Sequence, residues 1–459
     1  MLDHTNIAVL DLTHAGIIIA EKFASLGFNV TAIDVYKTVD EDILSGLLSE
    51  YGIISSKYPL PVDEFDMVVS PAHLDPVYPM LVAAREQNIE IMTHHRAVGF
   101  ILSIIGSFDN ATVIEVTGSK AKTSSASLLA EMLSMEKKVV LHTSRGLELW
   151  EMGYSTILQL GLSIAPGSIL LATDRLNELG IVADYYIFEV SIGLTGFADI
   201  GLITTLEPDY LIAASSSKAS DSKMSVLSDG GSEEVFFLNS RDRKALDKAG
   251  DNNRKYFTFS DSEEVEADLQ VHFDNGNIVI KYRYGQGDGY FISSLSPNYN
   301  YSSYATAFAA SASVAIRMHV SMENILSVVA SFEGLQGRMQ EKELSGRKLI
   351  DNSNSGMDIR SAEKALDYAL RKLAISGSVI MVLGEEAAQV CEGLPPDNVS
   401  EFVSRRGMDI GQLILVGERM QGIDGENVVY ALGLEEGLSM ALESSSKSDI
   451  ILSCVKCFR

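Results

Sequence analysis

Short apolar runs alternate with amphipathic stretches in the N-terminal part of the chain. Asn6 to Leu12 is predicted to be a strand, Ala15 to Leu26 has the apolar spacing of a helix, and Asn29 to Val35 is predicted to be a second strand. The same alternation continues through Phe65 to Ser70, a helix over about Val77 to Gln87, and Ile89 to Thr93. Strands that alternate with helices favour a parallel, doubly wound sheet, which we expect to end near 107–110.

Two further α/β regions are expected to follow. The second begins with the apolar run Ala111 to Val116, and the third begins near Gly334 to Gly337. Turn residues at Asp274 to Asn277 predict hairpins in the alternating stretch Leu269 to Ile292. The expected loops are Gly230-Gly231 and Asp251–Glu264. The other expected elements are a helix over Ser302–Met318 and the strands Lys138–Leu141, Tyr185–Val190, Ile200–Thr205, Arg347–Ile350, Val379–Leu383, Leu413–Val416, Asn427–Tyr430 and Asp449–Leu452.

The composition limits the class of protein. A length of 459 residues suggests about three domains. The formal net charge of −26 argues against binding to nucleic acid or to an anionic membrane, both of which favour basic surfaces. No apolar run approaches a membrane span, the N-terminus lacks a basic signal-peptide start, and three cysteines indicate a reducing cytoplasm. Cys454 and Cys457 form one CxxC, a weak metal or redox signal.

The strongest chemical signal is the segment Gly118-Ser119-Lys120-Ala121-Lys122-Thr123-Ser124. It follows the apolar run that ends at Val116 and precedes a helical pattern. A tight loop between a strand and a helix presents backbone N–H groups and a helix N-terminus to nucleotide phosphates. The lysine neutralises phosphate charge, and the hydroxyl that follows it is a Mg²⁺ ligand. The spacing differs from Walker A, because only three residues separate Gly118 from Lys122.

This shorter loop resembles the G-T-N-G-K-T-T loop of the Mur ligase superfamily, and other segments resemble that superfamily in the same order. They are Phe188–Ser191, Ala198–Thr204, Glu207–Leu211, Lys223 near the family's A-A-K lysine, Leu238–Asp242, Gln336–Gln340, which is similar to G-R-M-E, and Asp351–Ser355. One match could arise by chance, whereas this many in one order is a specific signal.

The resemblance implies an α/β fold of three domains. These are an N-terminal Rossmann-like substrate domain over residues 1–108, a central P-loop ATPase domain over 109–335, and a C-terminal Rossmann-like domain over 336–459. It also implies a reaction in which ATP phosphorylates a substrate carboxylate, a nucleophile attacks the resulting acyl phosphate, and phosphate leaves. Phosphoryl transfer of this kind depends mainly on positioning and charge neutralisation.

The resemblance further implies roles for individual residues. Lys122 would hold the β- and γ-phosphates of ATP, and Thr123 and Glu189 would bind Mg²⁺. Lys223 would be the lysine that many members carbamylate to make a metal-binding carboxylate. The residues implied to meet the nucleotide from the C-terminal domain are Arg338 and Asp351.

The chain departs from the family pattern at several positions. Ala121 replaces the glycine before the catalytic lysine, so a positive φ there would strain the loop. Lys120 adds positive charge where the family has asparagine. Tyr210 replaces a histidine linked to a second metal, and a neutral phenol is a poor Mg²⁺ ligand. The turn Asp11–Gly16 stands where some members carry G-x-G-x-x-G, which makes a UDP-linked substrate less expected.

Within the superfamily, the chain most resembles the archaeal MurD-like branch, the coenzyme F-430 synthetases. The Asp11–Gly16 turn, the 118–124 loop, Tyr210 and the short C-terminus carry this resemblance. It implies the final step of coenzyme F-430 biosynthesis, in which a propionate of a nickel seco-tetrapyrrole is phosphorylated and a carbon nucleophile of the same macrocycle closes a carbocyclic ring. The expected partner is this small molecule, bound by a monomer or homodimer.

Other interpretations stay open. A C–N ligase of the same fold would require an amine co-substrate, and a nucleotide-binding protein with a decayed site would bind ATP without turnover. His94 and His95 follow a predicted strand at an edge where α/β folds bind ligands, so they could touch a metal or carboxylates, or belong to a polar loop. The expected contacts of substrate carboxylates are Arg96, Arg145 and Arg175.

Overall fold

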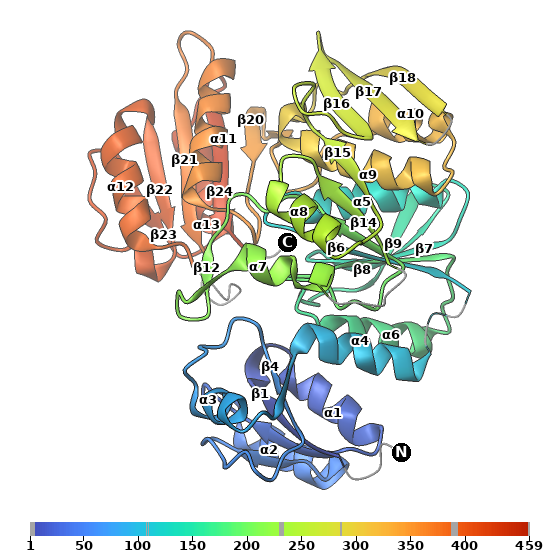
Figure 1. Cartoon of the computed structure of the whole chain (residues 1–459). Helices are drawn as coiled ribbons and strands as arrows, with labels where there is room; N and C mark the ends of the chain where they lie inside the picture. Colours follow the sequence, from blue (N-terminus) through green and yellow to red (C-terminus); the bar gives the residue numbers. More distant parts are fainter. Residues whose placement is uncertain are drawn as a thin grey trace. The chain divides into compact units, whose positions relative to one another are not determined.

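A computed structural model of the chain describes residues 5–106, 108, 110–228, 234–284, 287–386 and 393–457. The chain forms two compact units (Figure 1). The first unit comprises Met1–Asp274, Ile278–Ile292 and Ala305–Val328, and the second unit comprises Asn275–Asn277, Ser293–Tyr304 and Val329–Arg459. Among the described residues, no helix is both long enough and apolar enough to cross a membrane.

The first unit begins with a five-stranded parallel sheet in the order β3-β2-β1-β4-β5. The strand β1 is central, and its buried residue Val9 pairs with Ala32 on one side and Val69 on the other. The strand order reverses between β1 and β4, where open α/β sheets bind ligands at the carboxyl ends of the strands. The elements are β1 (Asn6–Leu10), α1 (Ile17–Ser25), β2 (Asn29–Ile33), α2 (Glu41–Tyr51), β3 (Ile54–Ser56), β4 (Met67–Ser70), α3 (Pro79–Glu86), β5 (Glu90–Thr93) and α4 (His94–Ile105).

The first predicted strand is shorter than its apolar run. It ends at Leu10, because Asp11 adopts a left-handed conformation with φ 66° and accepts a hydrogen bond from the Thr13 N–H. A short π-helix, Leu12–Gly16, follows before α1 begins. Gly16 permits this turn, because a Cβ atom there would lie 2.3 Å from the Asp11 carbonyl oxygen.

The second sheet of the first unit has eleven strands in the order β18-β17-β16-β15-β14-β11-β6-β10-β7-β8-β9. The strands from β16 to β7 pair in parallel, and β8 and β9 add antiparallel pairs at one edge. Its strands are β6 (Thr112–Thr117), β7 (Val139–Thr143), β8 (Gly146–Glu151), β9 (Tyr154–Gln159), β10 (Tyr185–Glu189), β11 (Ile200–Ile203), β14 (Val235–Asn239), β15 (Tyr256–Ser260), β16 (Leu269–Asp274), β17 (Asn277–Tyr284) and β18 (Gly287–Ser294).

Helices cover this sheet, and a separate two-stranded sheet lies in the chain between β11 and β14. Helix α9 packs against α5 and against β15 and β16 (Figure 1). The elements are α5 (Lys122–Ser134), α6 (Ser168–Leu179), the antiparallel pair β12 (Leu211–Ile212) and β13 (Ser217–Lys218), α7 (Ala219–Lys223), α8 (Arg243–Asp251), α9 (Ala305–Arg317) and α10 (Met322–Ser331).

Two sequence expectations in this region have clear outcomes. The hairpin region is confirmed as three neighbouring strands, β16 to β18. The prediction of a loop over Asp251–Glu264 is wrong, because β15 occupies Tyr256–Ser260 and Phe259 is fully buried. Gly230-Gly231 lies outside the described residues.

The five-stranded sheet and the eleven-stranded sheet share one hydrophobic core. Phe23 of α1, Val98 of α4 and Leu170 of α6 belong to the same buried cluster, and α4 lies beside α6 (Figure 1). Lys22 of α1 also pairs with Asp174 of α6 at 2.5 Å. The division of the first unit at residue 108 stays a prediction.

The second unit holds a six-stranded sheet in the order β19-β20-β24-β21-β22-β23, parallel except for the β19–β20 pair. Cys454 and Cys457 are both buried but belong to different hydrophobic clusters, which does not favour a shared metal ion. Its elements are β19 (Gln340–Leu344), β20 (Arg347–Asp351), α11 (Ile359–Lys372), β21 (Val379–Glu385), α12 (Pro396–Arg406), β22 (Gln412–Val416), β23 (Val428–Ala431), α13 (Leu434–Ser444) and β24 (Ile450–Lys456).

Candidate functional site

The candidate site lies in the first unit, at the carboxyl edge of the large sheet. Four neighbouring strands, β11, β6, β10 and β7, pair in parallel and therefore end at the same edge. The 118–121 loop joins the end of β6 to the start of α5, and Glu189 is the last residue of β10. This arrangement confirms the strand, loop and helix predicted around the 118–124 segment.

The backbone of the loop is tightly constrained at both ends. Gly118 has φ 145°, and a Cβ atom there would lie 2.1 Å from Thr204 Oγ1. Ala121 caps the N-terminus of α5 in the left-handed conformation, with φ 66° and ψ 0°. A non-glycine residue there costs roughly 1–2 kcal/mol. The alanine therefore adopts the backbone that its glycine counterpart in the superfamily would take without strain.

Loop side chains and neighbouring strands hold the loop in place. The Ser119 N–H donates to the Thr205 carbonyl at 2.7 Å, and Thr204 Oγ1 donates to the Lys120 carbonyl at 2.6 Å. Lys122 Nζ donates to the carbonyl of Gly118 at 3.0 Å, so its ammonium group folds back over the loop. A phosphate bound at this helix N-terminus would meet that charge.

Thr123 and Glu189 form a close side-chain pair at the end of the loop. Thr123 Oγ1 lies 2.8 Å from Glu189 Oε2 and 3.0 Å from Oε1, and both residues are buried. Ser144, just after β7, donates its N–H to Glu189 Oε2 at 3.2 Å, and its Oγ lies 3.5 Å from Thr123 Oγ1. Hydroxyl and carboxylate oxygens are the ligands that Mg²⁺ prefers, so this group of side chains fits that ion.

Lys223 reaches the same loop from α7. Its side chain is buried, its Nζ donates to Ser119 Oγ at 3.2 Å, and the ammonium lies 4.5 Å from the centroid of the Tyr210 ring. Burial, with repulsion from Lys122, lowers the pKa of Lys223 to about 8, although Asp209 opposes this shift. The lysine is therefore partly neutral near neutral pH, and a neutral amine can act as a nucleophile.

The structure brings most of the predicted nucleotide residues together and leaves the predicted substrate arginines on separate elements. Ser124 is buried in the first turn of α5. Arg145 follows Ser144 and pairs with Glu148 at 3.3 Å. Arg96 is exposed on α4, and Arg175 on α6 pairs with Glu178 at 3.0 Å. The role of each arginine stays a prediction.

Arg338 and Asp351 belong to the second unit. Asp351 ends β20, is buried, and accepts hydrogen bonds from the N–H groups of Gly337 and Ser353, each at 3.2 Å. Arg338 follows Gly337 directly, and its carbonyl accepts a hydrogen bond from the Tyr304 hydroxyl at 2.5 Å. The two predicted residues therefore lie on adjoining segments of one unit, and their role toward the nucleotide stays a prediction.

Sequence reasoning missed Ser144 and Asp209. Ser144 carries no motif, and its position after a strand that ends at the loop edge was its only signal. Asp209 lies within a family-like segment and accepts two hydrogen bonds from Ser220. Burial alone would raise the pKa of Asp209, but the hydrogen bonds from Ser220 and from the Tyr210 N–H outweigh burial and lower it. Asp209 therefore keeps a negative charge near Lys223.

The expectation of a polar loop at His94 and His95 is wrong, because α4 begins at His94 and both rings are buried. His94 Nε2 lies 2.9 Å from the Leu10 carbonyl, and His95 Nε2 lies 2.7 Å from the Ser191 carbonyl. Burial lowers their pKa values to about 3 and about 4. Both imidazoles are therefore neutral and bonded to backbone, which suits a structural role.

Known proteins resemble this chain in sequence and in fold. The family described as coenzyme F430 synthetase CfbE, C-terminal domain, matches residues 341–457. The coenzyme F(430) synthetase of Methanosarcina acetivorans is 49% identical over 99% of this chain and 98% of its own length.

Two solved structures share the fold at low identity. The MurF ligase of Thermotoga maritima, in complex with ADP, has a TM-score of 0.55 and 15% identity over 93% of this chain and 90% of its own. A folylpolyglutamate synthase/dihydrofolate synthase complexed with AMPPNP and Mn ion, from Yersinia pestis, has a TM-score of 0.57 and 15% identity over 79% and 90% of the two chains. Both likenesses agree with the α/β fold that the sequence predicts. The identity to the Methanosarcina acetivorans protein goes further, and it shows that the chain belongs to the coenzyme F430 synthetase family.

Proposed function

We propose that the chain is an ATP-dependent synthetase that phosphorylates a propionate carboxylate of a nickel seco-tetrapyrrole and closes a carbocyclic ring by C–C bond formation. This reaction is the final step of coenzyme F430 biosynthesis and gives ADP and phosphate. The observation that carries the proposal is the Thr123–Glu189 pair beside Lys122. It occurs in a chain that is 49% identical to a coenzyme F(430) synthetase over nearly its whole length.

The 118–124 segment binds the phosphates of ATP in this proposal. The loop N–H groups and the α5 N-terminus face the anion, and Lys122 moves from the Gly118 carbonyl to the β- and γ-phosphates. Thr123 Oγ1 and Glu189 hold Mg²⁺, which when bound neutralises charge on the transferred phosphoryl group. Residues 1–108 bind the tetrapyrrole and residues 109–335 bind ATP in this proposal, and the candidates for nucleotide contacts in residues 336–459 are Arg338 and Asp351.

The chemical step balances without an amine. A propionate oxygen attacks the γ-phosphorus and ADP leaves. A carbon of the same macrocycle then loses a proton and attacks the acyl carbon, the C–C bond forms, and the bond to phosphate breaks. The product has lost the elements of one water. Arg96, Arg145 and Arg175 are the candidates for holding the other carboxylates of the substrate.

Lys223 has a separate proposed role. Because its pKa is lowered to about 8, its neutral form can react with CO₂ to form a carbamate. That carbamate would add an anionic oxygen ligand beside Ser119, to which Lys223 Nζ already donates at 3.2 Å. The enzyme acts in the cytoplasm as a monomer or homodimer in this proposal.

The test is an anaerobic incubation with Mg-ATP and the nickel seco-tetrapyrrole acid, in which phosphate and product mass are followed together. Phosphate in a one-to-one ratio with a product lighter by one water, with no amine present, is the expected result. Lys122→Met is the inactive control, and Lys364→Gln at an exposed position of α11 is the surface control. Turnover that requires an amine would replace the proposal with a C–N ligase, and ATP binding without any turnover would favour a decayed site.

A further inference from the structure

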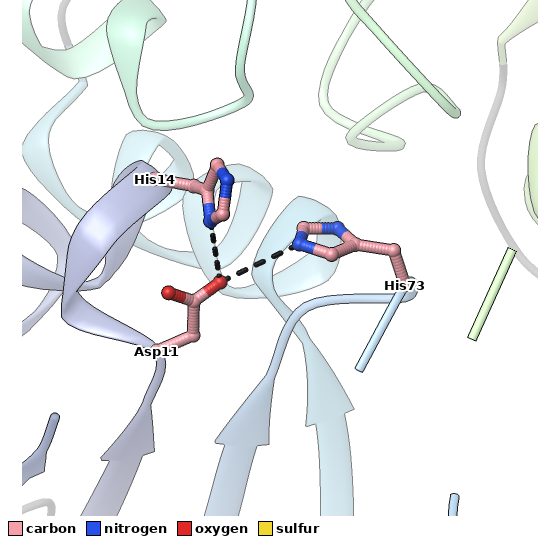
Figure 2. A group of neighbouring side chains, drawn as sticks. All are labelled: Asp11, His14 and His73. Carbon is pink, nitrogen blue, oxygen red and sulfur yellow. Dashed lines mark hydrogen bonds and ion pairs between the residues drawn. The ribbon is translucent and has the colours of Figure 1, made fainter. Parts of the chain in front are cut away.

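A second cluster of chemically active side chains lies apart from the nucleotide site, at the carboxyl edge of the five-stranded sheet. Asp11 follows β1, His14 lies in the turn after it, and His73 follows β4, the neighbour of β1 in the sheet. Figure 2 shows both imidazole rings turned toward the carboxylate of Asp11. The strand order reverses between these two strands, so three ligand-type side chains meet where such sheets bind ligands.

The three side chains converge on one point. His14 Nδ1 lies 2.8 Å and His73 Nε2 lies 3.5 Å from the same oxygen, Asp11 Oδ2. Two ligand atoms about 2.1 Å from one metal ion, at bond angles of about 90–109°, are about 3.0–3.4 Å apart. Both observed distances therefore come within a few tenths of an ångström of the spacing around a shared ion. One ligand atom from each residue lies within 4.8 Å of the others.

The turn holds Asp11 in place before any ligand binds. Its side chain is fully buried, its Oδ1 accepts the Thr13 N–H at 3.1 Å, and its own N–H donates to the Ile33 carbonyl at 3.0 Å. Gly16 allows the turn to close over the Asp11 carbonyl. A buried carboxylate in this position repels a diphosphate and attracts a cation.

An independent observation comes from His73. Its Nε2 is inaccessible to solvent and has no hydrogen-bond partner among the described residues, although it points at Asp11 Oδ2 from 3.5 Å. The ion pair with Asp11 at 3.5 Å is longer than an ordinary N–H···O hydrogen bond, so it satisfies this buried nitrogen only weakly. An ion beside Asp11 Oδ2 would give the nitrogen a ligand bond.

We propose that Asp11, His14 and His73 form a binding site for a divalent transition metal ion of the Zn²⁺, Co²⁺ or Ni²⁺ class. Two imidazole nitrogens and one carboxylate oxygen favour these ions over Mg²⁺ and Ca²⁺, which prefer oxygen ligands. Three protein ligands leave at least one coordination position for water or another small ligand. The side chains of His14 and His73 are 32% and 29% exposed, so the edge of the site reaches solvent although the Asp11 carboxylate and His73 Nε2 are buried.

The test measures metal binding directly and does not depend on the proposed reaction. The full-length protein is treated with EDTA to remove bound metal and is then titrated with Zn²⁺ and with Co²⁺ by calorimetry and absorption. Excess Mg²⁺ is present so that the oxygen ligands at Thr123 and Glu189 are already occupied. The expected result is one tight site with Co²⁺ absorption bands, weakened at least tenfold by His14→Ala and by His73→Ala. His319→Asn, at an exposed histidine after α9, should leave the metal affinity unchanged.

Thermal unfolding and ATP binding check that each variant is folded. Because His14 and His73 are partly exposed, the alanine variants should fold, whereas Asp11→Asn also alters the cap of the turn and serves only as a third comparison. Metal affinity that is equal in the wild type and the two histidine variants would overturn the proposal. So would the absence of any tight site in the folded wild type.

Discussion

The Thr123 hydroxyl is the group whose removal tests the nucleotide site most directly. Valine has nearly the same shape as threonine, so Thr123→Val removes the Oγ1 contacts of 2.8 and 3.0 Å to Glu189 with little change in packing. The Ser144 N–H then remains as the hydrogen-bond donor to that carboxylate among the described residues. Thr123→Ser is the matched control, because it keeps the hydroxyl and loses only a methyl group.

The size of the effect follows from the charge of the partner. An interaction of a hydroxyl with a charged group contributes about 1.5–3 kcal/mol, and each 1.36 kcal/mol is tenfold in an equilibrium or rate constant. We therefore expect Thr123→Val to weaken Mg-ATP binding by about 10- to 160-fold, and Thr123→Ser by less than about threefold. ATP without Mg²⁺ depends on Lys122 and the loop N–H groups, so its affinity should change little in either variant.

Calorimetric titration with ATP, in the presence of Mg²⁺ and in EDTA, separates these effects. Thermal unfolding of each variant shows whether the fold is retained. If Thr123→Val bound Mg-ATP within threefold of the wild type, the hydroxyl would not be an ion ligand. An equal loss of ATP affinity with and without Mg²⁺ would also refute the prediction, because it would show general damage to the loop and not the loss of an ion ligand.

Three further predictions concern stability and pH. Gly99→Ala places a Cβ atom 2.5 Å from the Thr195 carbonyl oxygen, so it should lower the free energy of unfolding by about 1–3 kcal/mol. The control Gly46→Ala in α2 meets no atom within 4 Å, so it should raise the free energy of unfolding by about 0.5–1 kcal/mol. Thermal unfolding distinguishes the two, and similar shifts would contradict the packing. Burial lowers the pKa of His95 from its ordinary value of 6.5 to about 4 in the folded chain. The unfolded chain therefore binds this proton first, and the free energy of unfolding should fall as pH drops from 6.5 toward 4. Urea unfolding should show a shallower fall for His95→Gln, and an equally steep fall would argue against a contribution from His95. If Lys223 is carbamylated, the phosphate-release activity of the wild type should rise with pH toward 8 and with added bicarbonate. Lys223→Arg should be inactive and insensitive to bicarbonate in the same assay. An active arginine variant would exclude a carbamate.

Local features of the fold and site were predictable from sequence, because they depend on neighbouring residues. The loop from Gly118 to Thr123 combines strand, turn and helix signals within one short segment. Glu189 could be inferred because it ends an apolar run that resembles a known segment. The interior of β15 was missed, since Tyr256–Ser260 contains threonine and serine and lies between polar stretches.

Features that depend on strand order could not be predicted in the same way. Asp11 and His14 are close in sequence, but only the pairing of β1 with β4 brings His73 to them. Ser144 joins Thr123 because β7 is next to β10 and β10 is next to β6. The early end of β1 is instead a local feature that the apolar run concealed, because the Asp11 side chain accepts the Thr13 N–H and the π-helix Leu12–Gly16 follows.

The shared core of the first unit has a consequence for inheritance. Phe23, Val98 and Leu170 lie in one buried cluster although they belong to segments on both sides of residue 108. A recombination event that replaced one segment alone would leave apolar side chains facing a surface that evolved with another partner. The tetrapyrrole-binding and nucleotide-binding specificities that we propose for these segments would therefore be passed on together, and new substrates would be acquired by substitution within the turns rather than by exchange of a whole module.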